Sequence, residues 1–286
     1  MAPAPPGGTE YDPAALERAE RHARADLWDA APPAVAAEYG IERRDFGPIE
    51  ATTGRRELGR DVTLLLGAAE PGAADEGFLA EAVEWCRGRD ARAYAPLVPG
   101  RLGFDRAQAW LERDDFERSG GWVRFARDPH PPRFPKPEGI EVRPVEPGDD
   151  TPFGFEASFG ASSTFGVRVP SWLASVLAAL PGRDGWRCYV ALAEGGDAAA
   201  AAVFDDGPIT VLAVDTAWEI GENRARPALL HRIIVDAAAA GAKAIAARVD
   251  ERADGPPKSA ATGLLLAGFE EAYRCPGWVD ARLPAR

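Results

Sequence analysis

The sequence predicts an α/β (α+β) protein built as two tandem units, each a mixed, mostly antiparallel sheet flanked by helices. Residues 209–242 read as a strand, a charged turn and a helix, with hairpin strands before them and a further strand, helix and strand after them. A similar order of helix, strand, helix and strand ends the stretch before residue 128. Its residue-level similarity is weak, so the first unit is predicted to be a degenerate copy of the second.

The strand–turn–helix stretch is the best defined part of this pattern. Ile209 to Thr216 is a near-continuous apolar run. The helix that follows has Pro227 in its first turn, where a missing N–H costs nothing, and ends at Gly241. A helix that follows a strand through a short turn points backbone N–H groups and a partial positive charge at the turn. Such a turn suits a phosphate or a thioester oxygen, although most turns of this kind bind nothing.

Helix and strand signals of the first unit run in order from residue 11. Asp12 supplies an N-cap and Pro13 the first helical position, and Pro32-Pro33 ends this helix. The further elements predicted are an irregular strand within 39–50, a strand at 61–66, a helix at 78–86, a strand at 93–98, a helix from Asp105 and a strand at 121–126. This unit shows no strand–turn–helix with a Gly- or Arg-rich turn. We therefore assign it no donor site and expect it to be a structural partner that closes the acceptor pocket.

A proline-rich segment divides the chain. Residues 128–138 contain five prolines, which predict a stiff, extended spacer. We therefore expect one domain at 11–127 and another at 139–286, after a disordered stretch at 1–10 that has nothing to bury. The elements predicted for the second domain are strands at 140–145, 186–193, 198–204, 209–216, 243–251 and 272–279, and helices at 171–180, at 226–241 and just before Ala267.

Composition excludes several classes of function. The net charge of −12 argues against a broad nucleic-acid-binding surface, because such proteins use Lys and Arg to neutralise phosphates. No apolar run reaches the about 18 residues of a membrane span, and the first residues lack the basic and apolar regions of a secretory signal. Three widely spaced Cys and three His predict neither a disulfide framework nor a metal site. We expect a cytoplasmic protein whose oligomeric state the sequence leaves open.

The order of elements in the second unit, together with its Ala267-Gly268-Phe269-Glu270 ending, resembles the GNAT superfamily of N-acetyltransferases. The Trp186-x-x-Tyr189-x-Ala pattern resembles an actinobacterial branch of that group, and tandem members are known as a class. In the family the turn carries Q/R-x-x-G-x-G/A, whose amides hold the pyrophosphate of an acyl-coenzyme A. Here Gly221 stands at the first position and Arg224 at the middle glycine, so the turn is a degenerate form of this motif.

The resemblance also implies which residues would hold the donor. Backbone amides of Val214 and Thr216, at the end of the strand, would bind the pantetheine arm and the thioester oxygen. At the turn, Ala225 is the small residue, and Arg224 and Arg226 would replace the lost amides as phosphate partners. Leu264 stands where the family often has a tyrosine acid, which leaves Ser259 or Tyr273 as substitutes.

Acceptor and base residues are assigned by their place beside the strand end. Asp215, Glu219 and His231 are the candidates for the base, each with a plainer interpretation as a turn residue, a solvated loop charge or a flank of the buried helix face. The candidates for contact with the acceptor are Phe159, Trp186, Tyr189 and Glu251. Strand alternation places Trp186 and Tyr189 on opposite faces, and aromatic residues are also common in cores.

Three hypotheses of function follow. The first is an acyltransferase that uses acyl-coenzyme A. The second is an acyltransferase whose donor is a phosphopantetheine thioester on an acyl carrier protein, or an ester on tRNA. The third is a non-catalytic GNAT-like module that binds a ligand or partner. We favour acyl transfer from a pantetheine thioester to an amine or hydroxyl of a small molecule, in specialised metabolism, with no metal and no membrane involved.

Overall fold

The computed structural model describes residues 11–55, 58, 62–132, 134–149, 171–193, 198–215, 225–251 and 258–282. Within these ranges the strands form a three-stranded sheet, β1-β2-β3, and an eight-stranded sheet in the order β4-β11-β5-β10-β9-β8-β7-β6. The elements are α1 (Pro13–Asp29), α2 (Pro33–Tyr39), β1 (Glu42–Phe46), β2 (Ile49–Thr53), β3 (Leu65–Leu66), α3 (Phe78–Arg87), β4 (Tyr94–Pro96), α4 (Phe104–Arg113), β5 (Phe116–Arg127), β6 (Ile140–Pro144), α6 (Ser171–Ala178), β7 (Trp186–Ala193), β8 (Ala198–Asp206), β9 (Ile209–Asp215), α7 (Ala225–Ala239), β10 (Ala244–Glu251), α8 (Lys258–Leu266) and β11 (Glu270–Asp280).

The same order of elements occurs twice along the chain. The first half runs β1-β2-β3-α3-β4-α4-β5, and the second runs β7-β8-β9-α7-β10-α8-β11. In each half the third and fourth strands meet in parallel, through a bridge between Leu64 and Tyr94 in the first half and through β9 and β10 in the second. The predicted mixed α/β architecture of two repeated units is confirmed.

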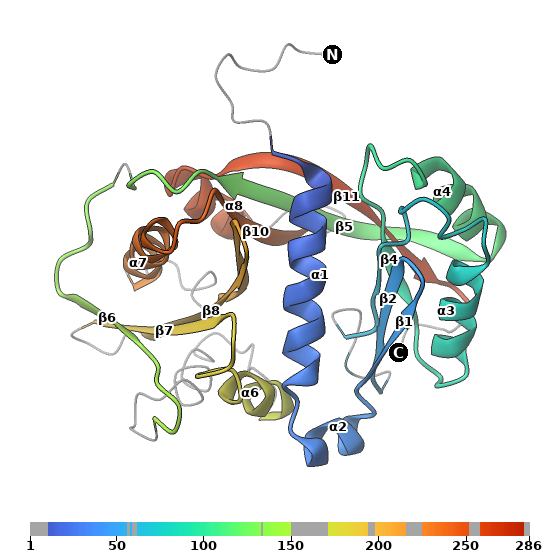
Figure 1. Cartoon of the computed structure of the whole chain (residues 1–286), viewed down its shortest axis with the longest axis horizontal. Coiled ribbons are helices and arrows are strands. Elements are labelled where there is room, and N and C mark those ends of the chain that lie inside the picture. The colour runs from blue at the N-terminus through green and yellow to red at the C-terminus, as the bar shows by residue number, and fades with distance from the viewer. Residues whose placement is uncertain are drawn as a thin grey trace, which may run out of the picture.

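Each half contributes its last strand to the sheet of the other half. Strand β5, which ends the first half, pairs antiparallel with β10, and β11, which ends the second half, pairs antiparallel with β4. The two exchanged strands also pair with each other, and they run side by side behind α1 across both halves (Figure 1). The domain boundary predicted at 128–138 stays a prediction. Strands from both sides of it pair in one sheet.

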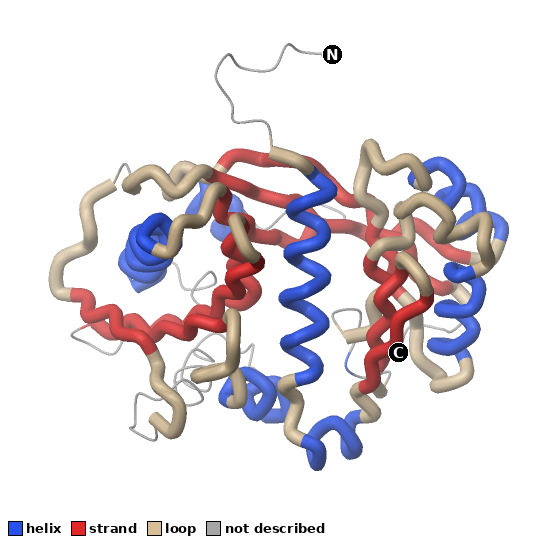
Figure 2. The backbone as a smooth tube through the Cα atoms, viewed as in Figure 1, coloured by secondary structure: helices blue, strands red, loops and turns tan. Residues whose placement is uncertain are grey.

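Helix α1 covers the middle of the large sheet. It begins as the sequence predicts, with the Asp12 side chain accepting a hydrogen bond from Ala14 N at 2.9 Å and with Pro13 at the first position. Its buried stripe, which includes Leu16, Ala19 and Ala23, packs on side chains of β5, β9, β10 and β11. Figure 2 shows the helix in front of the strands. Helices α7 and α8 pack on the opposite face of the same sheet.

A buried cluster of charges joins α1 to the exchanged strand β5. The side chain of Arg124 is fully buried, and its Nη1 lies 3.1 Å from Oε2 of Glu20. Arg24 Nε is 3.1 Å from the other oxygen of Glu20, and Arg248 on β10 is 3.7 Å from it. Burial alone would raise the pKa of Glu20, but Arg124, followed by Arg24 and Arg248, outweighs it and lowers the pKa to about 2. The carboxylate is therefore ionised throughout the neutral range.

Three regions differ from the sequence-based expectation. Around 39–50 the end of α2 and the hairpin β1–β2 replace a single irregular strand, and Pro33 begins α2 because a proline is tolerated at the first helical position. Strand β5 begins at Phe116 instead of 121, because its pairing with β11 extends to Asp280. The first half also contains a strand–turn–helix, in which residues 67–77 join β3 to α3 and carry Gly67, Gly72 and Gly77.

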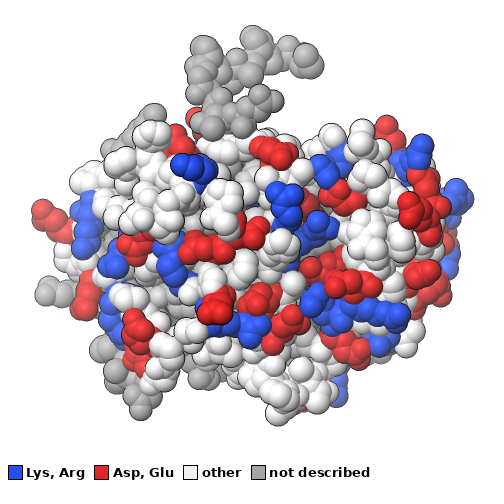
Figure 3. Space-filling view, in the orientation of Figure 1, with Lys and Arg blue, Asp and Glu red and all other residues white. Residues whose placement is uncertain are grey.

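One face of the described surface is of mixed charge. On the face seen in Figure 3, Lys and Arg side chains are interspersed with Asp and Glu. None of the helices in the described ranges is long and apolar enough to cross a membrane. Those ranges also contain no group of three or more His, Cys, Asp and Glu side chains that could hold a metal ion.

Replacing Glu20 should destabilise the fold strongly. Glu20→Gln leaves Arg124 buried without its counter-charge, and removing one partner of a buried pair typically costs about 3–5 kcal/mol. Chemical denaturation should show this loss in the free energy of unfolding. Glu117→Gln, at an exposed position of β5, is the matched control and should change it by about 0.5 kcal/mol or less. Equal effects of the two variants would contradict a structural role for the pair.

Glu50 should make the stability of the first half depend on pH. It lies on β2 opposite Asp45, is 9% exposed, and has one buried carboxylate oxygen, Oε1, without a hydrogen-bond partner among the described residues. Burial raises its pKa from the ordinary 4.5 to about 7. The folded state therefore holds a proton that the unfolded state loses first, and stability should fall as pH rises from 4.5 to 7.

Glu50→Gln should reduce this fall by about 3 kcal/mol, measured by denaturation at a series of pH values. The exposed residue Glu38 supplies the control, since Glu38→Gln should leave the wild-type pH dependence unchanged. Parallel curves for wild type and Glu50→Gln would show that the carboxyl titrates normally.

Candidate active site

The candidate site is the gap that opens where β9 and β10 diverge. Within the described strands, β9 and β10 pair in parallel only from Ile209–Ala244 to Leu212–Ala247. Beyond that point β9 stays with β8 as far as Asp215, and β10 stays with β5 as far as Glu251. The edges of the two strands that face the gap therefore have no strand partner there among the described residues, and their backbone N–H and C=O groups are suited to binding a ligand.

An irregularity in β9 contributes to this divergence. Ala202 pairs with Val214 and Val203 pairs with Leu212, so Ala213 is an extra residue in β9, as in a β-bulge. A bulge bends its strand and increases the local twist. Ala213 lies directly after the last residue of β9 that pairs with β10, so the bend coincides with the start of the gap.

Arg226 lies between the two helices that follow these strands. It stands in the first turn of α7 and is 8% exposed. Its guanidinium approaches Gly263 of α8 so closely that a Cβ added there would lie 2.3 Å from Arg226 Nη1. The structure therefore directs this predicted phosphate partner toward α8. Ala225, the first residue of α7, is fully buried.

Several predicted site residues lie outside the described residues. These are Glu219, Thr216, Arg224 and Phe159. Asp215 is placed by its backbone at the end of β9, beside the gap, but its side chain is not described. Val214 is half-buried and lies on the stretch of β9 that runs beyond the last pair with β10. The structure therefore places the strand end at Val214 and Asp215, whereas the turn at 216–224 lies outside the described residues.

His231 is placed against the segment that joins the two halves. Its ring lies 5.9 Å from the ring of Phe134, edge to face. Burial, followed by the positive charge of Lys136, lowers the pKa of His231, so its imidazole is neutral at neutral pH. The described contacts of this predicted base are thus with the 128–138 segment.

The predicted acceptor residues of β7 lie on opposite faces of the sheet. Trp186 packs with α6 and the end of α1, and its indole N–H donates to Asp26 Oδ1 at 2.7 Å. Tyr189 packs under α7, where its hydroxyl donates to Asp236 Oδ2 at 2.9 Å. The predicted alternation is confirmed, and the structure does not bring these two aromatic side chains together.

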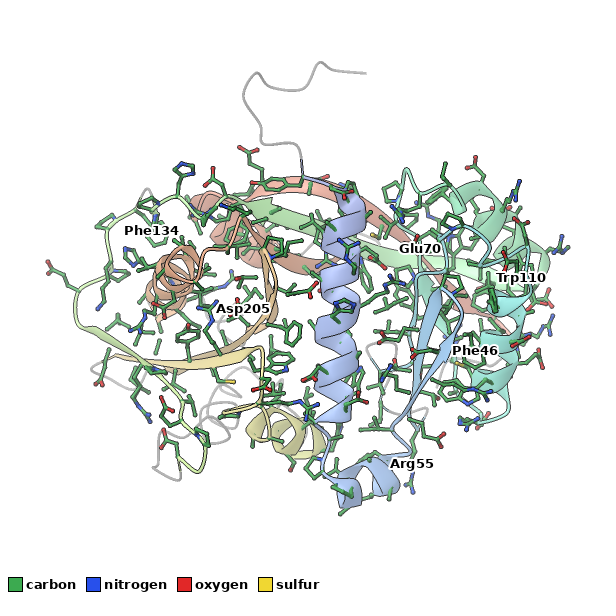
Figure 4. The ribbon with its side chains drawn as sticks, in the orientation of Figure 1. Phe46, Arg55, Glu70, Trp110, Phe134 and Asp205 are labelled. Atoms are coloured by element: carbon green, nitrogen blue, oxygen red, sulfur yellow. The ribbon has the colours of Figure 1, made fainter. Side chains whose placement is uncertain are left out.

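Tyr189 belongs to a polar network beneath α7. Arg187 donates to the Tyr189 hydroxyl at 3.1 Å and makes two bonds of 2.6 Å to Asp205, which Figure 4 labels. Burial raises the pKa of Tyr189, and the nearby charge of Arg187 only partly offsets this. A hydroxyl bonded on both sides in this way supports α7 on the sheet.

Two polar residues of β10 lie near the gap, and the sequence analysis named Glu251 but not Arg248. The predicted acceptor contact Glu251 lies 2.6 Å from Arg274 of β11. Arg248, one residue beyond the last pair with β9, stacks its guanidinium 4.6 Å from the Trp122 ring centre and is 3.5 Å from Asp250. The available signal was the charge spacing in β10, Arg248-Val249-Asp250, within an otherwise apolar strand.

Comparison with solved structures identifies the fold. The chain is similar to a GCN5-related N-acetyltransferase from Kribbella flavida, at a TM-score of 0.57 and 14% identity over 92% of this chain and 95% of that one. A GCN5-related N-acetyltransferase from Sphaerobacter thermophilus matches at a TM-score of 0.55 and 14% identity, over 94% and 93% of the two chains. A tandem GNAT protein from the clavulanic acid biosynthesis pathway matches at 0.52 and 16%, over 91% and 94%.

The similarity to these solved structures extends over nearly the whole chain, and the fold is that of an α/β protein of repeated units. The protein has the fold of the GCN5-related N-acetyltransferases, as the sequence resemblance predicts, and one of the similar structures shares the tandem arrangement. No protein-family model and no curated protein matches the sequence.

Proposed function

We propose that the protein is an acyltransferase that moves an acyl group from a pantetheine thioester to an amine or hydroxyl of a small molecule. The observation that carries this proposal is the gap between β9 and β10, which opens after Leu212 and Ala247. Pantetheine is an extended chain with amide groups. A chain of that kind can add to a free strand edge through backbone hydrogen bonds, as peptides do.

The chemistry follows from the position of the thioester at this edge. The acceptor nitrogen or oxygen attacks the thioester carbon, the C–S bond breaks, and the sulfur leaves as a thiolate while the acceptor proton passes to a base. A backbone N–H at the end of β9 suits the oxygen that becomes negative during this step. Of the proposed bases, Asp215 is the one that ends β9. A thiolate leaves readily near neutral pH, so the step does not depend on an acid.

The donor can be coenzyme A or a carrier protein. The strand gap suits the pantetheine arm that both donors share. The diphosphate is found in free coenzyme A, and its expected partners are Arg224, Ala225 and Arg226. The side chain of Arg226 turns toward Gly263, which does not favour a diphosphate at that position. A donor without the diphosphate is therefore as compatible with the described residues as coenzyme A.

The setting of the reaction is part of the same proposal. The fold similarity to a tandem GNAT protein from the clavulanic acid biosynthesis pathway supports a role in specialised metabolism, by analogy of fold. We place the reaction in the cytoplasm, on a small-molecule acceptor.

Calorimetry with acetyl-coenzyme A and with S-acetylpantetheine tests the proposal. At least one of them should bind the wild-type protein, and Ala213→Pro, which removes a backbone N–H at the bulge where the gap begins, should weaken that binding at least about tenfold, or about 1.4 kcal/mol. Val235→Trp, at a site 43% exposed on α7, is the control and should bind like wild type. Circular dichroism should show that both variants are folded.

The pattern of binding separates the donors. Tighter binding of acetyl-coenzyme A than of S-acetylpantetheine indicates a diphosphate contact, and equal binding favours a carrier-bound donor. If neither ligand binds and no acyl transfer is seen with acyl-coenzyme A or a loaded carrier protein, the protein is not an acyltransferase of this kind.

A further inference from the structure

Two charged side chains of β10, those of Arg248 and Asp250, stand beside the gap between β9 and β10. Arg248 directly follows Ala247, the last residue of β10 that pairs with β9, and Asp250 lies two residues further along. From Ala244 to Ala247 the strand is apolar and buried, so its charged residues begin where β9 leaves it. The side chains of Arg248 and Asp250 are 13% and 35% exposed, and Asp250 is therefore open to solvent beside the gap.

Both side chains face α1. Successive residues of a strand point to opposite faces of the sheet. Ala246 packs in the cluster under α1, whereas Val249 packs with α7 and α8. Arg248 and Asp250 therefore share the face of Ala246. The contacts agree, because the Arg248 guanidinium lies 4.6 Å from the ring centre of Trp122, the residue of β5 that pairs with Asp250.

The opposite face of the gap is covered by helices. Helices α7 and α8 pack on that face of the sheet. Between them Arg226 approaches Gly263 so closely that an added Cβ would clash with the guanidinium. We therefore expect the acceptor of the proposed reaction on the α1 face, where Asp250 is exposed.

Arg248 is held less tightly than the other guanidiniums of its cluster. Glu20 is bound at 3.1 Å by both Arg24 and Arg124, whereas Arg248 lies 3.7 Å from Glu20 and 3.5 Å from Asp250. Both of these distances exceed the about 2.7–3.2 Å of an ordinary N–H···O hydrogen bond. Stacking on an aromatic ring uses the flat face of a guanidinium, and the N–H groups at its edge match the two oxygens of a carboxylate.

We propose that Arg248 and Asp250 select an α-amino acid as the acceptor, with its carboxylate on Arg248 and its ammonium group on Asp250. A neighbouring cation and anion are complementary to a zwitterion. Such a ligand exchanges one loose ion pair for two close ones, whereas a simple amine or a simple carboxylate occupies one charge and leaves the other without its neighbour. The proposal rests on the proposed acyl transfer, because it names the amine that receives the acyl group.

Titration calorimetry on the full chain with each standard L-amino acid, with and without coenzyme A, tests the assignment. At least one amino acid should bind saturably. Two analogues of that amino acid should bind at least about tenfold more weakly: its amide, which lacks the carboxylate, and the corresponding 2-hydroxy acid, which lacks the ammonium group.

Arg248→Gln and Asp250→Asn should each weaken the binding of the amino acid at least about tenfold. The matched control is Arg89→Gln in the first half. Arg89 also stacks on a tryptophan, 4.3 Å from the Trp85 ring centre, and pairs with Glu42 at 2.7 Å. This control should bind the amino acid like wild type. Circular dichroism should show folded variants, and Asp250→Asn decides the matter if Arg248→Gln does not fold.

Two results would overturn the proposal: no saturable binding of any standard amino acid under either condition, or Asp250→Asn binding as tightly as wild type. The two proposals fail separately. If an acyl donor binds and no amino acid does, the acyl transfer stands and the amino acid acceptor is wrong. If an amino acid binds in the predicted way and no donor binds or reacts, the amino acid site is supported and the acyl transfer is wrong.

Discussion

Strand β5 pairs with β10 on one side and with β11 on the other, and the two halves of the molecule are joined through these ladders. Because β11 also pairs with β4, neither half can complete its sheet from its own chain segment. The exchange places Arg124 of the first half directly under α1, where Glu20 neutralises it. A fully buried guanidinium is stable only with such a partner, so α1, the exchanged strand and the sheet depend on one another.

The gap between β9 and β10 follows from the same exchange. Strand β10 is held by β5 along its whole length to Glu251, so it follows β5 beyond Ala247. Strand β9 follows β8 instead, and the extra residue at Ala213 bends it at that point. The antiparallel pairings of β10 with β5 and of β9 with β8 are longer than the parallel pairing of β9 with β10. Each strand therefore follows its antiparallel partner, and β9 and β10 separate. The free backbone edges of the proposed acyl-transfer site result from this competition.

Because the fold repeats, a crevice also forms at the ends of the corresponding strands β3 and β4 in the first half. The two crevices differ in their surroundings. The one in the first half is closed off by α1, which presents Glu17, and by the ion pair of Glu70 and Arg101. The gap in the second half has backbone edges on both sides. The same order of elements therefore leaves strand edges without a described strand partner in one half and buries a side-chain carboxylate in the other.

Local patterns in the sequence determined the individual elements. Asp12 and Pro13 begin α1 as predicted, the apolar spacing from Phe78 predicts α3, and the stretch 209–242 predicts β9 and α7, because caps and apolar periods act within a few residues. They also predicted the repeat and a strand at 209–216, of which the structure describes Ile209–Asp215 as β9. Only the tertiary structure decided that β5 pairs outside its own half, that Glu20 meets a residue 104 positions away, and that Arg226 turns toward Gly263. Such contacts join segments that are far apart in the sequence, and no local pattern predicts them. They form because a charged side chain buried in the folded protein needs a partner there.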